Sequence, residues 1–216
     1  MRLVFVRHAE STANAEARLQ GHAEFELSES GRAQAERLRG RFEAEGFQPT
    51  YIYSSPQRRT AETARIVACL WPLSITCWDE LMEHDIGIFS GLTWREIEDR
   101  YPDMARQFQV SRDWDLVQGA ETLAQRRARA RRVVETVIHK HGNEDVVLLF
   151  THGGILQRMI AALMGTGRTW GMNVRNTGVF DFSLDLERWS LSGDGLLNTT
   201  HWHIRHFNDA SHLLGL

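Results

Sequence analysis

Two short apolar segments of this chain are each followed closely by a histidine. Residues Leu3 to Val6 form one run, with His8 two positions after its end, and Val146 to Phe150 form another, with His152 two positions after its end. Apolar runs of this length are typical of buried strands. Ligands of open α/β sheets bind outside the carboxyl ends of the strands. We therefore expect the two imidazoles to converge in one pocket at that edge of a sheet.

Short apolar runs and longer stretches with helical periodicity alternate along the chain. The pattern predicts strands over residues 3–6, 51–53, 73–78, 146–150, 179–184 and 201–207, and helices over residues 30–45, 57–70, 94–101, 121–141 and 155–164. Strands separated by helices of this length imply right-handed crossovers and a mainly parallel sheet. We expect a three-layer α/β sandwich in one domain of 216 residues. Residues 79–119 lack a strong strand and are expected to form a small helical cap.

The charge pattern excludes several classes of partner. With a net charge of −3, the chain gives no reason to expect nucleic acid or an anionic membrane as a partner. The basic run from Arg126 to Arg132 is interpreted as the solvated face of a helix. No stretch of about 18 apolar residues occurs, so no membrane span is expected. The chain starts directly with a strand, which predicts the absence of a signal peptide.

Cysteine and histidine usage argues against a disulfide framework and against a metal site. The two cysteines, Cys69 and Cys77, are too few for a disulfide framework and do not have the Cys-x-x-Cys spacing of a metal site. We therefore expect the protein to lie in a reducing cytoplasm. His201 and His203 would share one face of a late strand. No carboxylate or cysteine nearby completes a recognisable ligand set. We therefore expect no metal and no other cofactor.

The residues after the strands suit the handling of a phosphate ester. Arginine donates paired hydrogen bonds to phosphate oxygens, and Arg7 stands beside His8 while Arg58 follows the strand at 51–53. A neighbouring cation lowers the pKa of a histidine and keeps it neutral. His8 is therefore predicted to be a nucleophile that carries the phosphoryl group. His152 is predicted to stabilise charge on the phosphoryl oxygens.

A general acid and further donors complete the predicted site. Glu83 is chosen as the acid, because a partly desolvated carboxyl beside a bound dianion would have a raised pKa. An ordinary surface carboxylate is the alternative, since Glu80 and Asp85 lie close in the sequence. Ser11 and Asn14 follow His8 and could donate to substrate oxygens or could cap a helix.

Several motifs occur in a fixed order along the chain. They are Arg-His-Ala-Glu-Ser at 7–11 with Asn14, Leu-Gln-Gly at 19–21, the Leu-Ser-x-x-Gly segment at 27–35, the Ser-Ser-Pro block at 54–64, Leu-x-Glu at 81–83 and Thr-His-Gly-Gly at 151–154. In this order the motifs resemble the histidine phosphatase superfamily, the phosphoglycerate-mutase-like proteins. The resemblance implies their fold and places the second phosphate arginine at Arg58. It also implies that Gln20, Gly21 and Gly153 lie at the substrate.

Departures from the family pattern favour the phosphatase branch. Ala9 replaces a usual glycine, which is a mild change if its φ is negative, and Phe89-Ser90-Gly91 replaces a usual Trp-Glu-Gly. Cofactor-dependent mutases carry a longer, basic insertion, whereas residues 92–102 offer only Arg95 and Arg100. We expect a metal-independent phosphatase of small phosphorylated metabolites. A mutase-type phosphotransferase, a phosphatase dedicated to one intermediate such as α-ribazole phosphate and a non-catalytic phosphate-binding module stay open, as does a homodimer.

Overall fold

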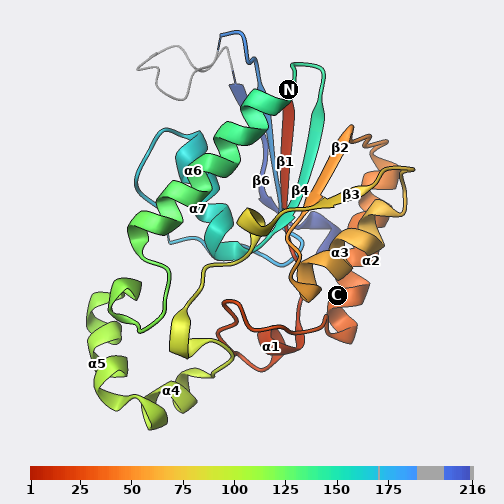
Figure 1. The fold of residues 1–216 in the computed structure, drawn as a ribbon. Coiled ribbons are helices and arrows are strands. Elements are labelled where there is room, and N and C mark those ends of the chain that lie inside the picture. Colours follow the sequence, from red (N-terminus) through yellow and green to blue (C-terminus); the bar gives the residue numbers. More distant parts are fainter. Residues whose placement is uncertain (170, 189–201, 215–216) are drawn as a thin grey trace.

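The computed structural model describes residues 1–169, 171–188 and 202–214 (Figure 1). In this part of the chain a six-stranded sheet has the order β3-β2-β4-β1-β5-β6. The strands are β1 (Arg2–Arg7), β2 (Tyr51–Ser54), β3 (Ile75–Cys77), β4 (Val146–Thr151), β5 (Val179–Leu184) and β6 (Trp202–Asp209). Strands β1 to β4 pair in parallel, and β5 and β6 pair antiparallel. The predicted mainly parallel α/β sheet is confirmed.

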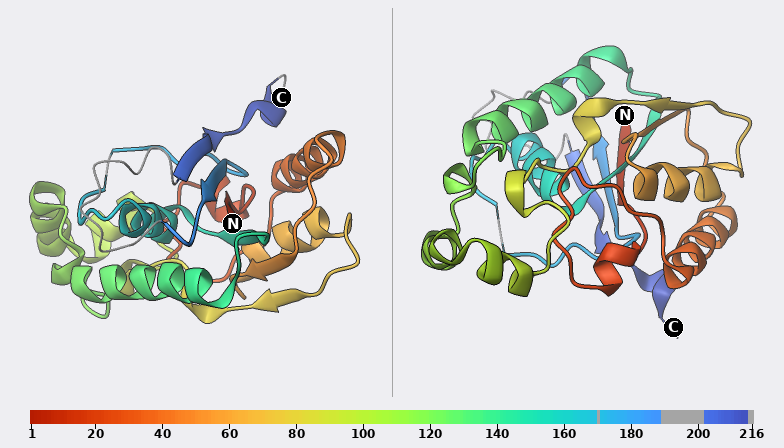
Figure 2. Two further views of the ribbon diagram at one scale, coloured as in Figure 1. Left: turned by 90° about the horizontal axis from the view of Figure 1, so that it is seen from above. Right: turned by 60° about the horizontal axis from the view of Figure 1, so that its bottom comes forward.

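Helices cover both faces of this sheet (Figure 2). The helices of the described residues are α1 (Thr12–Ala15), α2 (Glu29–Ala44), α3 (Arg58–Ala68), α4 (Trp94–Arg100), α5 (Pro102–Ser111), α6 (Leu123–Lys140) and α7 (Gly153–Leu163), with short 3-10 turns η1 (Asp79–Leu81), η2 (Gly87–Phe89), η3 (Trp114–Leu116) and η5 (Ser211–Leu213). Successive strand residues point to opposite faces. Leu3 and Phe5 therefore pack toward α6 and α7, and Val4 and Val6 pack toward α2 and α3. Because helices cover both faces of the sheet, residues 3–6 of β1 are all apolar. The fold therefore has three layers, with the sheet between two layers of helices.

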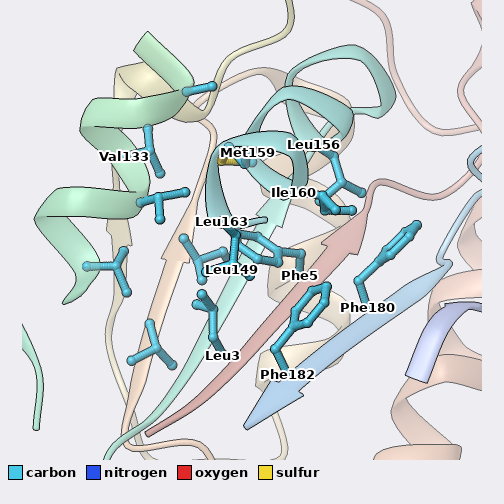
Figure 3. Packing of buried hydrophobic residues seen from close by; sticks show 14 of the residues in the cluster. Leu3, Phe5, Val133, Leu149, Leu156, Met159, Ile160, Leu163, Phe180 and Phe182 are labelled. Atoms are coloured by element: carbon cyan, nitrogen blue, oxygen red, sulfur yellow. The ribbon is translucent and has the colours of Figure 1, made fainter. Parts of the chain in front are cut away.

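The core on the α6–α7 side is built around aromatic residues of the central strands (Figure 3). Phe5 and Phe182 meet edge to face, with ring centroids 6.3 Å apart. Phe180, Leu149 and Met159 are fully buried in the same cluster. Complete burial of each such side chain contributes about 1.5–3 kcal/mol to folding. The tightly packed core therefore holds the ends of β1 and β4 in fixed positions.

The pairing of β1 with β4 brings the two histidines together. The strands are in parallel register, with Arg7 opposite Thr151, so that the next residues are His8 and His152. The backbone N–H of His8 continues the ladder by donating to the carbonyl of Thr151 at 2.9 Å. Both imidazoles thus leave the sheet at its carboxyl edge.

A separate apolar cluster lies beyond that edge, where α4 and α5 are found (Figure 1). Its aromatic side chains, whose contacting pairs have ring centroids within 6.4 Å, are Phe89, Trp94, Tyr101, Phe108 and Trp114. The predicted helix at 94–101 is found as α4. Helix α5 was missed, although Pro102 at its first turn is a helix-start signal. The description of the chain as one domain with a cap at 79–119 stays a prediction.

The remaining expectations concern metal ions and membranes. His201 lies outside the described residues, and His203 is exposed on β6. Among the residues that the structure describes, no group of three or more His, Cys, Asp or Glu side chains is placed to hold a metal ion. No helix in the same ranges is long and apolar enough to cross a bilayer.

Candidate active site

A cavity of about 300 Å³ opens at the carboxyl edge of the sheet. Arg7 and His8 from the end of β1, Arg59 from α3, Glu83 from the segment after η1 and Trp114 from η3 contribute to its lining. Segments from distant parts of the sequence therefore meet around one space. Several positive groups and one carboxylate share it.

His8 is held in a single tautomer. Its Nδ1 lies 2.7 Å from the carbonyl oxygen of Ala9. A carbonyl only accepts hydrogen bonds, so Nδ1 carries the proton and Nε2 keeps its lone pair. Burial, followed by the charges of Arg7 and Arg59, holds the pKa of His8 well below its usual range. Ala9 does not have a positive φ, which explains why alanine can replace glycine there.

His152 lies beside His8 at the N-cap of α7. Their ring centroids are 5.1 Å apart. Nε2 of His152 lies 2.8 Å from the Ser55 hydroxyl and 3.1 Å from the Thr60 hydroxyl, both of which are buried. Burial and the charge of Arg59 hold the pKa of His152 well below its usual range. The predicted meeting of two strand-end histidines is therefore found, and both rings are neutral in the free protein.

The arginine from α3 that reaches the cavity is Arg59, and the prediction of Arg58 was wrong. Arg58 is 62% exposed at its side chain and pairs with Glu26 at 2.5 Å. Arg59 is fully buried and donates to the carbonyls of Ala23 and Gly21, both at 3.1 Å. The spacing Ser-Ser-Pro-x-x-Arg, counted from Ser54, itself ends on Arg59. The spacing of the motif therefore already indicated Arg59.

Arg7 and Arg59 line the cavity, and each has an N–H group without a protein partner among the described residues. One guanidinium NH₂ group of Arg7 donates to the carbonyl of Val174. The Nε–H groups of Arg7 and Arg59 are buried and have no partner among the described residues. Burial lowers the pKa of Arg59 to about 10, which still leaves it charged at neutral pH. Buried cations with unpaired N–H groups are suited to a bound anion.

Glu83 is fixed at the beginning of α7. Its carboxylate accepts from the backbone N–H groups of Gly154 and Ile155 at 3.0 Å each and of His84 at 2.9 Å. Burial alone would raise the pKa of Glu83. The charge of His84, the N–H donors and Arg59 outweigh this and hold the pKa below its usual value. The expected raised pKa is therefore not a property of the ligand-free protein.

The glycine that lines the cavity is Gly154, whereas Gly153 lies outside its lining. A Cβ atom on Gly154 would lie 2.7 Å from Oε1 of Glu83 and 2.9 Å from Nδ1 of His84. A Cβ atom on Gly153 would meet Arg7 at an ordinary 3.5 Å. The close approach between α7 and the Glu83 segment therefore needs glycine at the second of the two positions. Gly154, and not the predicted Gly153, is therefore the glycine at the cavity wall.

The loop after β1 brings two amides to the cavity. Asn14, Gln20 and Gly21 line it, but Ser11 is buried behind them as the N-cap of α1. Ser11 donates to the side-chain oxygens of both amides. Its backbone N–H donates to Oδ1 of Asn14 at 3.1 Å, and its hydroxyl donates to Oε1 of Gln20 at 2.9 Å. The NH₂ groups of Asn14 and Gln20 have no hydrogen-bond partner in the described ranges. Ser11 therefore orients the donors and does not itself line the cavity.

Gln57 and His84 are site residues that the sequence patterns did not single out. Gln57 is fully buried, its Nε2 donates to the Gly21 carbonyl at 2.9 Å, and its Oε1 accepts from the N–H of Glu83 at 2.8 Å. The side chain of Gln57 thus links the loop at Gly21 to the segment that carries Glu83. His84 lines the cavity, and burial lowers its pKa to about 4. Gln57 occupies an unspecified position of the Ser-Ser-Pro block, which gave no signal.

The chain belongs to the histidine phosphatase superfamily (branch 1), whose family model matches residues 3–194. Phosphoglycerate mutase-like protein 4 of Arabidopsis thaliana is 32% identical over 213 residues, covering 98% of this chain and 86% of the relative. Metal-independent phosphoserine phosphatase of the same plant is 32% identical over 194 residues, covering 87% and 80%. The solved structure of Bacillus stearothermophilus YhfR has a TM-score of 0.80 at 29% identity, covering 98% of both chains. The resemblance drawn from the motifs is confirmed.

Proposed function

We propose that this protein is a metal-independent phosphomonoesterase, a phosphoric monoester hydrolase of the histidine acid type that acts through a phosphohistidine at His8. One observation carries the proposal. Nε2 of His8 holds a free lone pair because Nδ1 donates to Ala9, and the ring lies buried near the charges of Arg7 and Arg59. A buried neutral imidazole beside two cations is suited to attack the phosphorus of an anion that those cations hold.

Arg7 and Arg59 hold the phosphoryl oxygens in this proposal. Each charge-assisted hydrogen bond contributes about 1.5–3 kcal/mol. The amide groups of Asn14 and Gln20, oriented by Ser11, add neutral donors at the other side of the cavity. The arginines and the amides donate to phosphate without taking up a proton.

The first chemical step transfers the phosphoryl group to the enzyme. Nε2 of His8 forms a bond to phosphorus, the ester P–O bond breaks, and the leaving oxygen takes a proton from Glu83. Glu83 is the carboxyl group that lines the cavity. In the ligand-free protein its pKa is low, so protonation of Glu83 accompanies the binding of the anionic ester.

The second step regenerates the free histidine. Water attacks the phosphohistidine, the P–N bond breaks, Glu83 accepts the proton of the water, and inorganic phosphate leaves. His152, 5.1 Å from His8 between ring centroids, takes up a proton in the phosphate-bound state and stabilises the charge on the transferring oxygens. The Ser55 and Thr60 hydroxyls keep its ring in position.

Trapping of the phosphoenzyme tests this function. The protein is mixed with a ³²P-labelled monoester and quenched without acid, because acid hydrolyses the P–N bond of a phosphohistidine. We expect label on the wild type and on H139A, whose histidine is exposed on α6 and lies outside the cavity lining, and none on H8A. Equal labelling of H8A would contradict the assignment of the nucleophile.

The names of the relatives give the first candidate substrates to test. Among them, one has the name of a metal-independent phosphoserine phosphatase and another of a phosphoglycerate mutase-like protein. Release of inorganic phosphate from a panel of phosphorylated metabolites, phosphoserine and 3-phosphoglycerate included, would rank substrates. Isomerisation that depends on a bisphosphate primer would instead indicate a mutase. Phosphate binding without any turnover would indicate a binding module.

A further inference from the structure

A single arginine on α6 holds the backbone of the segment that carries Glu83. Nη1 of Arg129 donates to the carbonyls of Glu80 and Met82, both at 2.8 Å, and Nη2 lies 3.4 Å from the carbonyl of Glu83 itself. These three carbonyls lie within four successive residues. The guanidinium therefore fixes the path of the backbone leading up to the carboxylate.

Glu121 fixes the guanidinium in turn. Its two carboxylate oxygens accept from Nε and Nη2 of Arg129 at 2.8 and 2.6 Å. Both side chains are largely buried, at 13% and 15% exposed. Although burial would raise the pKa of Glu121, its hydrogen bond to Arg129 and the charge of that residue help to hold the pKa below its usual value. Glu121 is therefore a carboxylate at neutral pH.

The donors and acceptors of this cluster match one for one. A guanidinium has five N–H donors in a rigid plane, and Arg129 has five acceptors within 3.4 Å. A lysine, with three donors on a flexible stem, cannot reproduce this arrangement. Arg129 does not line the active-site cavity but a neighbouring one of about 640 Å³. It therefore acts on the site through the backbone.

We propose that Arg129 is a positioning residue that places the Glu83 carboxyl for protonation of the leaving group. The inference rests on the proposed function. Displacement of a catalytic group by about 1 Å can lower a rate by about a hundredfold. Loss of Arg129 should therefore impair the proton transfer without weakening the phosphate contacts, which come from other elements.

The dependence of the rate on the leaving group tests this role. Phenyl phosphate needs protonation of its leaving oxygen, whereas 2,4-dinitrophenyl phosphate does not. For R129M we expect kcat/KM on phenyl phosphate, which reports the phosphoryl transfer to His8, to fall by about tenfold or more, with kcat/KM on the dinitrophenyl ester within about threefold. The matched control is R132M, one turn along α6, where the arginine is 54% exposed and pairs with Glu80. It should leave both esters unaffected.

Further variants separate positioning from a loss of folding. E83Q should show the same selectivity for the leaving group, and R129M/E83Q should be no slower than E83Q alone, since both changes affect one proton transfer. If R129M does not fold, R129K and E121Q provide the same comparison with milder changes. An equal loss on both esters, or no difference from R132M, would overturn the proposal. Absence of wild-type turnover on both esters would instead count against the phosphatase function.

Discussion

The imidazole of His8 faces that of His152 at 5.1 Å between ring centroids and 58° between ring planes. The parallel pairing of β1 with β4 produces this arrangement, because Arg7 and Thr151 are in register immediately before the two histidines. The site is therefore anchored in the middle of the sheet. Its other members come from loops and helix ends that are held against this centre by hydrogen bonds.

The adjacent arginines Arg58 and Arg59 provide a matched pair of variants. R59M should lower kcat/KM by about a hundredfold, which corresponds to one or two charge-assisted hydrogen bonds to phosphate. R58M should change it by less than about twofold, because an exposed ion pair contributes little. Steady-state kinetics with circular dichroism as a folding check would show this. R59K covers the case in which R59M does not fold, and a larger loss in R58M would refute the placement of Arg59 at the phosphate.

The neighbouring glycines of α7 should respond differently to alanine. In G154A the new Cβ lies 2.7 Å from Oε1 of Glu83, closer than real contacts allow. The carboxylate must move, and we expect kcat to fall by about tenfold to a hundredfold. G153A adds only ordinary contacts with Arg7 and should keep more than half of the activity. Kinetics of both variants on one monoester would decide, and comparable losses would contradict the role of Gly154.

The low pKa of His8 predicts activity below pH 6. A histidine with an ordinary pKa near 6.5 loses about eightfold of its neutral form between pH 7 and 5.5. Burial, Arg7 and Arg59 lower the pKa of His8, so the neutral form should persist at pH 5.5. We expect kcat/KM to stay within about threefold over this interval, after correction for ionisation of the substrate. A decline that follows a pKa of 6.5 would show that His8 is not shielded in solution.

The buried His84 should make the fold sensitive to acid. Burial lowers its pKa to about 4, while the unfolded chain binds a proton near 6.5. The unfolded state therefore takes up more protons as the pH falls below 6.5, and the free energy of unfolding decreases. Between pH 7 and 5 the contribution of His84 is on the order of 2 kcal/mol. Urea unfolding at both pH values should show a smaller decrease for H84N than for the wild type, and identical decreases would exclude this origin.

Much of the architecture was predictable because its elements have clear periods. Strands β1 and β4 are buried on both faces and are therefore continuous apolar runs, and α2 begins after Ser28, which caps it at the backbone N–H of Gly31. The four-residue α1 is too short for a period to show. Helix α5 did carry a signal that was overlooked, because Met104, Ala105 and Phe108 recur with helical spacing and pack in the cap cluster.

The site was predictable at its anchors and less so at its rim. His8 and Glu83 line the cavity and His152 lies beside His8, whereas Arg58 and Gly153 are each one residue away from the side chain or backbone that reaches the cavity. Adjacent residues of a helix point about 100° apart. An error of one position at a helix start therefore exchanges a buried group for an exposed one. The roles of Gln57 and Arg129 depend on contacts with distant backbone, for which the sequence carries no local signal.

The carboxylate of Glu83 accepts from the N–H groups of Gly154 and Ile155 in the first turn of α7. The positive end of this helix is therefore already neutralised, and it cannot serve as a second cradle for phosphate. An incoming ester in its fully ionised form meets a negative charge at the place where a proton will be needed. In the proposed reaction the proton that departs with the alcohol must therefore arrive with the ester or from solvent at the moment of binding, so that substrate uptake and proton uptake form a single event.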